Sequence, residues 1–482
     1  MKNKKQVGHI ISFFAGVAKL KGLPNVFINE TLLDKDNKEV AIVIGFDLDH
    51  VEALFFQNNF DLNEPVYRSN KTFSIQISEN VTGRIINGLG KPIDNLGNIE
   101  SDNYPVFTNS PTIIDRESIN QPLSTGIKIL DTTLPLGKGQ RQLIIGDRKL
   151  GKTTIATDIV LNQKNATPLV QCVYVICGQK EKKLKDLISL FEKNNAFLYT
   201  TIVTATSNAT FAEQYLAPFV GCTIAEYFRN KNQDALVVYD DLSSHAKTYR
   251  NFALLLERSP GRESYPGDVF SIYAGLLERS AKIANGGSLS ALPIIETQES
   301  DITSFIPTNL ISITDGQIYL EQGLFQKGFL PAVNVGLSVS RVGSSAQPKI
   351  LKNIVGGIRL ALSQHKELQK LSQLETVLSN QAKKKIHRGE MILELLKQPK
   401  HVNISWPEQV VLFYVVEEGF FDQIASNQWS EFENSLLKLV KNKYPNILEQ
   451  IKNNKFDDSV KTSIKQMIKD FQNEFIIKLD MQ

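Results

Sequence analysis

A nine-residue segment, GDRKLGKTT at residues 146–154, restricts the fold more than any other part of the chain. Gly146 is followed by four residues and then by Gly151, Lys152 and Thr153, which is the spacing of a phosphate-binding loop. Average residue usage predicts only about 0.02 such matches by chance in a chain this long. A run of β-formers, RQLIIGD, precedes the loop, and a helical pattern, TTIATDIVLNQ, follows it. The segment therefore predicts a strand, a phosphate loop and a helix in an α/β nucleotide-binding domain.

The residues expected to touch a bound nucleotide follow from the chemistry of this loop. Its backbone N–H groups point at phosphate oxygens, Lys152 neutralises the outer phosphates, and Thr153 is a ligand for Mg²⁺. Downstream, the strand-like run ALVVYDD ends in Asp240 and Asp241. Because a carboxylate at a strand end can hold Mg²⁺ through water, Asp240 is predicted as the second magnesium-side group.

A hydrolase on this fold also needs a group that activates the attacking water, usually a carboxylate at another strand end. The run CVYVICG is followed directly by Gln179, which occupies that position. An amide donates and accepts hydrogen bonds but does not act as a base near neutral pH. Glu181 is the alternative carboxylate, but it lies two residues further along, past the expected strand end. Its segment, EKKLKD, is typical of a solvated helix start. These residues place an amide where a hydrolase is expected to have its activating carboxylate.

The charge balance and the cysteine positions argue against a nucleic-acid-binding protein, a zinc protein and a disulfide-rich protein. The 54 Lys and Arg residues nearly balance the 51 Asp and Glu residues, so charge does not indicate a nucleic-acid partner. Cys172, Cys177 and Cys222 fit neither a zinc site nor a disulfide framework, which predicts reduced core thiols in a cytosolic protein.

The N-terminal run HIISFFAGVA is predicted as a strand rather than a signal peptide. No run is long enough for a transmembrane segment, so any membrane role is expected through partners.

Three zones of different patterning predict three domains. Residues 1–77 alternate short β-rich runs with turns, which predicts a small antiparallel β-barrel or sandwich. Residues 78–345 alternate strand-like and helical runs, which predicts a mostly parallel sheet flanked by helices, the α/β P-loop domain. Residues 346–482 predict a C-terminal helical bundle. Its amphipathic helices are expected over residues 358–371, 388–398, 407–419, 431–453 and 459–479.

Seven longer motifs occur in order along the chain: QPLSTGIKILD, GDRKLGKTT, VYDDLSSHAKTYR, SPGRESYPGDVF, GGSLSALPIIETQESD, IPTNLISITDGQIYLE and PAVNVGLSVSRVGSSAQ. In sequence and spacing they resemble the alpha subunit of F-type ATP synthases, from about residue 7 to the end of the chain. The resemblance implies a β-barrel crown, a nucleotide-binding domain and a C-terminal helical domain. It also implies an alternating ring of three alpha-type and three beta-type catalytic subunits around a gamma-type central shaft.

The resemblance implies roles for individual residues. In that family the alpha subunit binds ATP or ADP with Mg²⁺ and does not turn it over, because a glutamine, here Gln179, stands where the beta subunit has its catalytic glutamate. The arginine of the segment SVSRVGS, here Arg341, is implied to be an arginine finger for the neighbouring catalytic site; an interface ion pair is the alternative. The nucleotide-binding residues predicted are Gly146, Asp147, Arg148, Lys149, Leu150, Gly151, Lys152, Thr153, Thr154, Pro331, Gln398 and Lys400, with Thr153 and Asp240 as metal ligands.

Several positions depart from the family pattern. Lys149 and Leu150 replace a common Gln-Thr pair in the loop, which leaves phosphate binding intact. In the pocket for the base, Leu330 replaces an arginine and Lys400 replaces a glutamine, which predicts weaker affinity or looser base selectivity. The chain also begins almost at the first barrel strand, without the N-terminal extension that docks the stalk in that family, so the stator partner is left open.

Three alternatives to a proton-coupled motor subunit follow from these features. One is an alpha-type subunit of a rotary motor that is not coupled to proton transport. Another is a self-sufficient homohexameric ATPase of the secretion or RNA-translocating type, against which Gln179 argues. The third is a ring spacer without nucleotide, against which Lys152 and Asp240 argue. The expected location is peripheral, at the cytoplasmic face of the cell membrane, with the membrane sector contacted only through other subunits.

Overall fold

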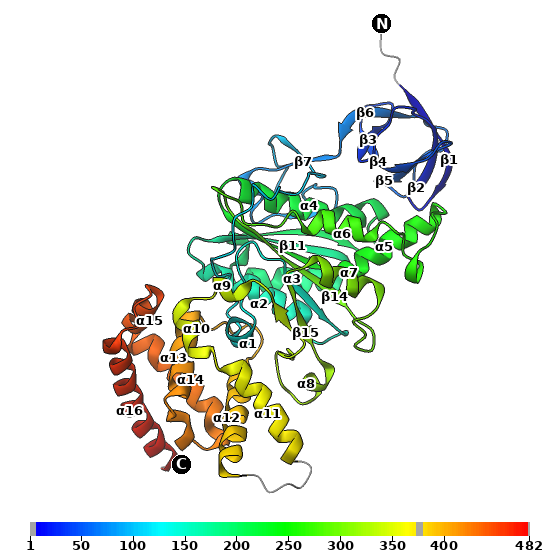
Figure 1. Cartoon of the computed structure of the whole chain (residues 1–482). Coiled ribbons are helices and arrows are strands. Elements are labelled where there is room, and N and C mark those ends of the chain that lie inside the picture. The colour runs from blue at the N-terminus through cyan, green and yellow to red at the C-terminus, as the bar shows by residue number, and fades with distance from the viewer. Residues whose placement is uncertain (1–5, 373–378, 481–482) are drawn as a thin grey trace. The chain divides into compact units, whose positions relative to one another are not determined.

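The computed structural model describes residues 6–372 and 379–480, and these residues form two compact units (Figure 1). Unit 1 comprises Met1–Ser118, Lys138–Arg148 and Gln163–Gln317, and unit 2 comprises Ile119–Gly137, Lys149–Asn162 and Ile318–Gln482. Each unit is thus assembled from three chain segments. The predicted domain boundaries after residues 77 and 345 follow the sequence pattern instead, and they remain a prediction.

A closed antiparallel barrel forms the N-terminal part of unit 1, drawn in blue in Figure 1. Its strand order is β1-β2-β5-β4-β3-β6. Alternate residues of these strands point inward, and Leu20, Leu32, Val43 and Val66 are buried in its core. The strands are β1 (Val7–Phe14), β2 (Val17–Gly22), β3 (Glu30–Leu33), β4 (Glu39–Phe46), β5 (Val51–Phe55) and β6 (Val66–Thr72).

Six parallel strands form the central sheet of unit 1, in the order β10-β14-β13-β11-β12-β8. Their residues are buried on both faces, as expected of parallel strands covered by helices. Because all six run in the same direction, their carboxyl ends share one edge of the sheet. The strands are β10 (Leu143–Gly146), β14 (Leu289–Glu296), β13 (Asp234–Asp240), β11 (Val170–Gln179), β12 (Thr200–Thr206) and β8 (Ile85–Asn87).

Helix α4 (Phe211–Asn230) packs against β11, β12 and β13 and is buried along most of its length. A capping box starts it: the Thr210 hydroxyl accepts a hydrogen bond from the Glu213 N–H, and the Glu213 carboxylate accepts one from the Thr210 N–H. The other helices and strands of unit 1 are α3 (Glu181–Lys193), α5 (Leu242–Leu255), α6 (Val269–Leu277), α7 (Phe305–Ile313), β7 (Ser74–Gln76) and β9 (Asn103–Pro105).

Unit 2 is mainly helical, and β15 (Gly316–Leu320) leads into it from unit 1. A buried carboxylate, Asp131, ties its first segment to the C-terminal helices, because it accepts hydrogen bonds from the Thr125 and Gly126 N–H groups and from Gln409 Nε2. The elements are α1 (Lys128–Thr133), α2 (Lys152–Asn162), α8 (Gln322–Gln326), β16 (Val339–Ser340), α9 (Gly343–Ala346), α10 (Lys349–Val355), α11 (Ile358–Ser372), α12 (Asn380–Leu396), α13 (Trp406–Glu417), α14 (Trp429–Lys443), α15 (Pro445–Lys452) and α16 (Asp458–Asp480).

The single helix expected over residues 431–453 is wrong, because two helices, α14 and α15, cover this stretch. The break falls at Tyr444, whose φ of −128° and ψ of 43° are not helical. Tyr444 precedes Pro445, and the proline ring disfavours the helical conformation of the residue before it. Pro445 itself suits the first position of the new helix, where no backbone N–H is needed.

The predicted fold class is confirmed: an antiparallel barrel, a mostly parallel sheet with helices and a C-terminal helical region follow one another along the chain. The predicted N-terminal strand is also confirmed by β1, while residues 1–5 lie outside the described residues.

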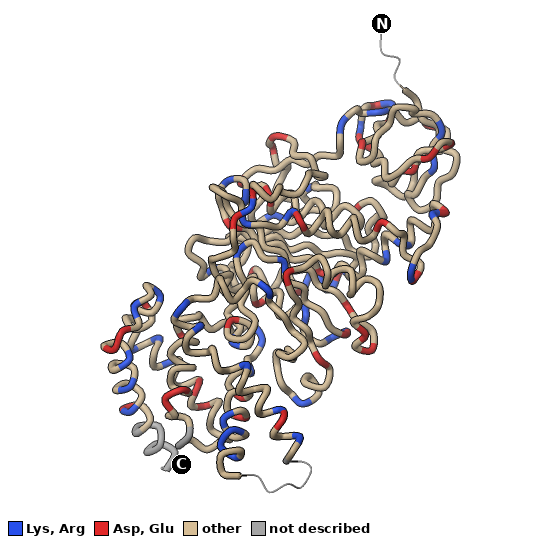
Figure 2. The backbone as a smooth tube through the Cα atoms, in the orientation of Figure 1, with Lys and Arg blue, Asp and Glu red and all other residues tan. Residues whose placement is uncertain are grey.

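All three cysteines are buried, and none of them forms a disulfide. Among the described residues, none of the helices has the length and apolar character of a membrane span. Lys and Arg positions, blue in Figure 2, are interspersed along the backbone with Asp and Glu positions, which are red.

Candidate nucleotide-binding site

The phosphate loop joins β10 to α2, as the sequence predicted. Gly146 is the last residue of β10 and Lys152 the first residue of α2. Gly151 has a φ of +97°, a conformation that favours glycine, so the chain can turn tightly before the helix starts. Lys152 is buried and Thr153 is half-buried. The division between the two units falls inside this loop, after Arg148, so the two ends of the loop are described separately.

In unit 1, Asp147 and Arg148 are held by residues at the end of β14 and just after it. The Asp147 carboxylate accepts hydrogen bonds from the Thr297 hydroxyl at 2.6 Å and from the Ser300 N–H at 2.9 Å. Arg148 Nε lies 2.7 Å from Glu296 Oε1, although the arginine side chain is largely exposed. These contacts fix the start of the loop at the carboxyl edge of the sheet.

Asp240 ends β13 and is 1% exposed, so its carboxylate is almost fully removed from water. One oxygen, Oδ2, accepts a hydrogen bond from the Tyr174 hydroxyl at 2.8 Å, and the other, Oδ1, lies 2.8 Å from Lys183 Nζ. Burial, and then the negative charge of Asp240, raise the pKa of Tyr174 well above its ordinary value, so this hydroxyl stays a donor. The predicted magnesium-side acid therefore has a partner on each oxygen.

Gln179 is the last residue of β11, next to β13 in the sheet. Its Nε2 donates a hydrogen bond of 2.7 Å to Asp241 Oδ2, while Asp241 Oδ1 accepts one of 2.6 Å from the Ser244 N–H and so caps α5. Burial, followed by the charge of Asp240, raises the pKa of Asp241. Glu181 is exposed and already belongs to α3, past the strand tip, as expected. The amide of Gln179 thus lies at the end of β11, hydrogen-bonded to the residue that follows β13.

In unit 2, a cavity of about 540 Å³ lies beside the second half of the loop. Its walls are mainly apolar, and they include Ile155, Phe325 and Leu330. A cavity of this size and lining suits a flat organic group such as a nucleotide base. The lining residues are Ile127, Lys149, Leu150, Gly151, Thr154, Ile155, Asp158, Phe325, Leu330, Pro331, Gln398, Pro399 and Lys400. The structure therefore brings together most of the unit 2 residues that were predicted to bind nucleotide.

Gln398 lines this cavity, but its side-chain amide is engaged by the backbone. Its Nε2 donates to the carbonyl oxygens of Gly126, at 2.7 Å, and Val402, and its Oε1 accepts from the Lys128 N–H at 2.8 Å. Both amide hydrogens are thereby used. Lys400, two residues on, is exposed. Gln398 holds the cavity wall in place, and neither residue presents an amide to a base.

Asp158 is a cavity residue that sequence reasoning missed. It lies on α2 and pairs with His401, whose Nδ1 is 2.7 Å from Asp158 Oδ1 and whose N–H donates to the same carboxylate at 3.1 Å. Burial raises the pKa of Asp158. The contact joins α2, the helix that follows the phosphate loop, to His401, the residue next to the cavity-lining segment 398–400. Its partners lie 243 positions apart, so spacing could not reveal it.

Arg341 follows β16 and is exposed. Among the residues that the structure describes, it has neither an ion pair nor a hydrogen-bond partner for its side chain. The backbone on both sides of it is fixed: the Ser340 hydroxyl donates to the Pro135 carbonyl at 2.7 Å, and a Cβ at Gly343 would lie 1.6 Å from that same oxygen. The segment thus presents an arginine outward from an anchored backbone.

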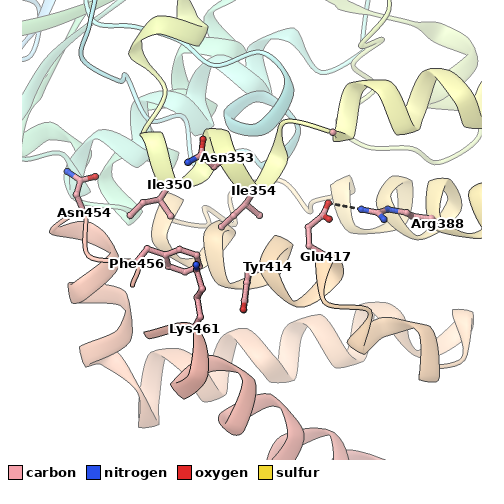
Figure 3. A pocket seen from close by; sticks show the side chains of 10 residues that line it. Ile350, Asn353, Ile354, Arg388, Tyr414, Glu417, Asn454, Phe456 and Lys461 are labelled. Carbon is pink, nitrogen blue, oxygen red and sulfur yellow. Dashed lines mark hydrogen bonds and ion pairs between the residues drawn. The ribbon is translucent and has the colours of Figure 1, made fainter. Parts of the chain in front are cut away.

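A second cavity in unit 2, of about 630 Å³, lies among the C-terminal helices (Figure 3). Ile354 of α10 and Phe456 contribute apolar walls, and Arg388 forms an ion pair of 2.7 Å with Glu417 at one end. None of its residues was predicted as functional. The lining residues are Ile350, Asn353, Ile354, Gly357, Arg388, Tyr414, Glu417, Asn454, Phe456 and Lys461.

Comparison with known proteins agrees with these features. Residues 126–340 match the family model of the ATP synthase alpha/beta family, nucleotide-binding domain, and residues 347–471 match that of the ATP synthase alpha/beta chain, C terminal domain. The chain is 42% identical over 487 residues to ATP synthase subunit alpha of Buchnera aphidicola, covering 97% of this chain and 94% of the relative. It is 43% identical over 483 residues to ATP synthase subunit alpha of Wigglesworthia glossinidia brevipalpis, with 96% and 94% covered.

Proposed function

Because the chain belongs to the ATP synthase alpha/beta family, we propose that it is the alpha-type, nucleotide-holding subunit of a rotary ATPase ring. The observation that carries this proposal is Gln179. Its amide occupies the strand tip beside Asp240 and donates to Asp241, so the site holds nucleotide without a base to activate water. A self-sufficient homohexamer would need its own catalytic carboxylate at this point.

Mg²⁺ would be held by the nucleotide phosphates together with Thr153 and Asp240. No group of three or more His, Cys, Asp or Glu side chains within residues 6–372 and 379–480 is arranged to hold a metal ion alone. This donor set fits an ion that keeps most of its ligands as water and phosphate oxygens. When bound, the ion would neutralise phosphate charge. Lys152 would bind the outer phosphates and Gln179 would orient polar groups without taking up a proton.

The partners proposed are beta-type catalytic subunits, alternating with this chain in a three-plus-three ring, and a gamma-type central shaft. Arg341 is proposed to serve the catalytic site of the neighbouring beta-type subunit, because its side chain is exposed on an anchored segment. The location proposed is the cytoplasmic face of the cell membrane, with the membrane sector reached only through other subunits.

The proposed holding role is tested by equilibrium binding to the purified chain. Titration with ATP in the presence of Mg²⁺ should show one nucleotide bound per chain, and nucleotide extracted afterwards should still be ATP. Recovery of ADP and phosphate at more than one equivalent per chain would contradict the proposal. A chain that binds no nucleotide under any condition would favour the ring-spacer alternative.

Base selectivity is expected to be weak. The amide of Gln398 is bound to backbone groups and the other walls are mainly apolar, so little in the cavity reads the edge of a base. ATP and GTP should bind with affinities within about tenfold of each other, equivalent to about 1.4 kcal/mol. Parallel titrations at matched Mg²⁺ measure this ratio.

The variant Lys400→Gln is the matched test, because it restores an amide at the exposed end of the same wall. It should move the ratio toward ATP and leave the affinity for inorganic triphosphate unchanged. A wild-type preference for ATP of more than about a hundredfold, or about 2.7 kcal/mol, would show that another group reads adenine.

A further inference from the structure

Lys183 lies on the first turn of α3, immediately after the strand tip that carries Gln179. Its ammonium group crosses to the tip of β13 and pairs with Asp240 Oδ1 at 2.8 Å, over a separation of 57 positions in the chain. The side chain of Lys183 is 30% exposed, whereas that of Asp240 is 1% exposed. A partly exposed lysine therefore forms an ion pair with a buried carboxylate.

The groups around Asp240 favour a cation next to its carboxylate. Its second oxygen already accepts the Tyr174 hydroxyl, and the adjacent Asp241 adds a second buried carboxylate, engaged by Gln179 and Ser244. Two neighbouring carboxylates in a low-dielectric site strongly favour a nearby cation. Lys183 supplies that charge from within the chain.

We propose that Lys183 is a built-in counter-ion of Asp240 that competes with Mg²⁺ for this carboxylate. This inference rests on the proposed nucleotide-holding function and adds a determinant of its metal dependence. Asp240 would hold Mg²⁺ only if the Lys183 ammonium group left Oδ1 or shared the carboxylate with the ion. The chain therefore holds nucleotide with a weaker dependence on Mg²⁺ than it would without Lys183.

The test compares ATP affinity of the full chain in excess Mg²⁺ and in EDTA, for wild type, Lys183→Met and Lys183→Gln. Methionine keeps the apolar stem without charge, and glutamine keeps a hydrogen-bond donor in case the methionine variant does not fold. In wild type, removing Mg²⁺ should weaken ATP binding less than about tenfold. In the uncharged variants, the loss of ATP affinity on removing Mg²⁺ should be at least about ten times larger than in wild type. Lys183→Arg, which keeps the charge, should behave like wild type.

Lys185→Met is the matched control, because it removes the same charge from an exposed position on the same helix. It should leave the ratio of the two affinities unchanged. Equal magnesium dependence in wild type and in the uncharged Lys183 variants would overturn the Lys183 proposal alone. Absence of ATP binding in every protein, with and without Mg²⁺, would overturn the holding function and this inference together.

Discussion

Replacing Arg341 with alanine is expected to lower ATP hydrolysis by the assembled ring by about 10³- to 10⁵-fold, while assembly and nucleotide binding to this chain stay largely intact. The side chain is exposed, and within the described part of the chain it contacts no partner, so it is available to a neighbouring subunit. Its backbone is held through Ser340 and Gly343, and a guanidinium beside a transferring phosphoryl group can stabilise the charge that spreads over that group.

The size of the effect separates the two interpretations of Arg341. Loss of an arginine finger corresponds to roughly 4–7 kcal/mol of transition-state stabilisation, whereas an exposed interface ion pair contributes about 1 kcal/mol or less. Arg341→Lys keeps the charge and loses the planar fork, so it should remain strongly impaired if the finger is correct. Hydrolysis within about tenfold of wild type in the alanine ring would make Arg341 a structural residue.

The second large effect is expected from Lys152→Ala, which should weaken ATP binding to the isolated chain by at least about a hundredfold. Lys152 starts α2 directly after the loop and is buried, so its ammonium lies where charged hydrogen bonds to phosphate are strong. One or two such bonds, at about 1.5–3 kcal/mol each, account for that change. Isothermal titration at constant Mg²⁺ measures it.

Lys149→Gln provides the control for this experiment. Lys149 lies in the same loop, is exposed, and takes here the place of a residue that is commonly glutamine in the family it resembles. Its replacement should change ATP affinity by no more than about threefold, since Lys149 is predicted to bind phosphate through its backbone N–H, which glutamine keeps, and an exposed side-chain charge is well screened. Unchanged binding in Lys152→Ala would contradict the assignment of the phosphate loop.

The fold class and the loop were predictable because each depends on local pattern. Alternating and continuous apolar runs distinguish the barrel strands from those of the parallel sheet, and the two glycines with Lys152 specify a phosphate loop. The break at Tyr444 was missed although it is also local, because the amphipathic pattern continues across Pro445 and outweighed the proline signal.

The contacts within the site were less predictable, because they join distant residues. EKKLKD was interpreted as a solvated helix start, yet Lys183 reaches Asp240 on another strand. Gln398 was predicted to bind nucleotide, but its hydrogen bonds run to Gly126 and Lys128, about 270 positions earlier. A sequence shows that an amide is present, whereas only the fold shows which groups have already used its donors and acceptor.

Steady-state hydrolysis by the purified chain tests the central proposal most directly. ATP and Mg²⁺ in large excess, with phosphate release followed over many potential turnovers, should give no more phosphate than the Lys152→Ala chain gives, because Gln179 cannot act as a base. Sustained turnover by the wild-type chain that disappears in Lys152→Ala would show that this chain catalyses hydrolysis by itself, and would contradict its assignment as the holding subunit.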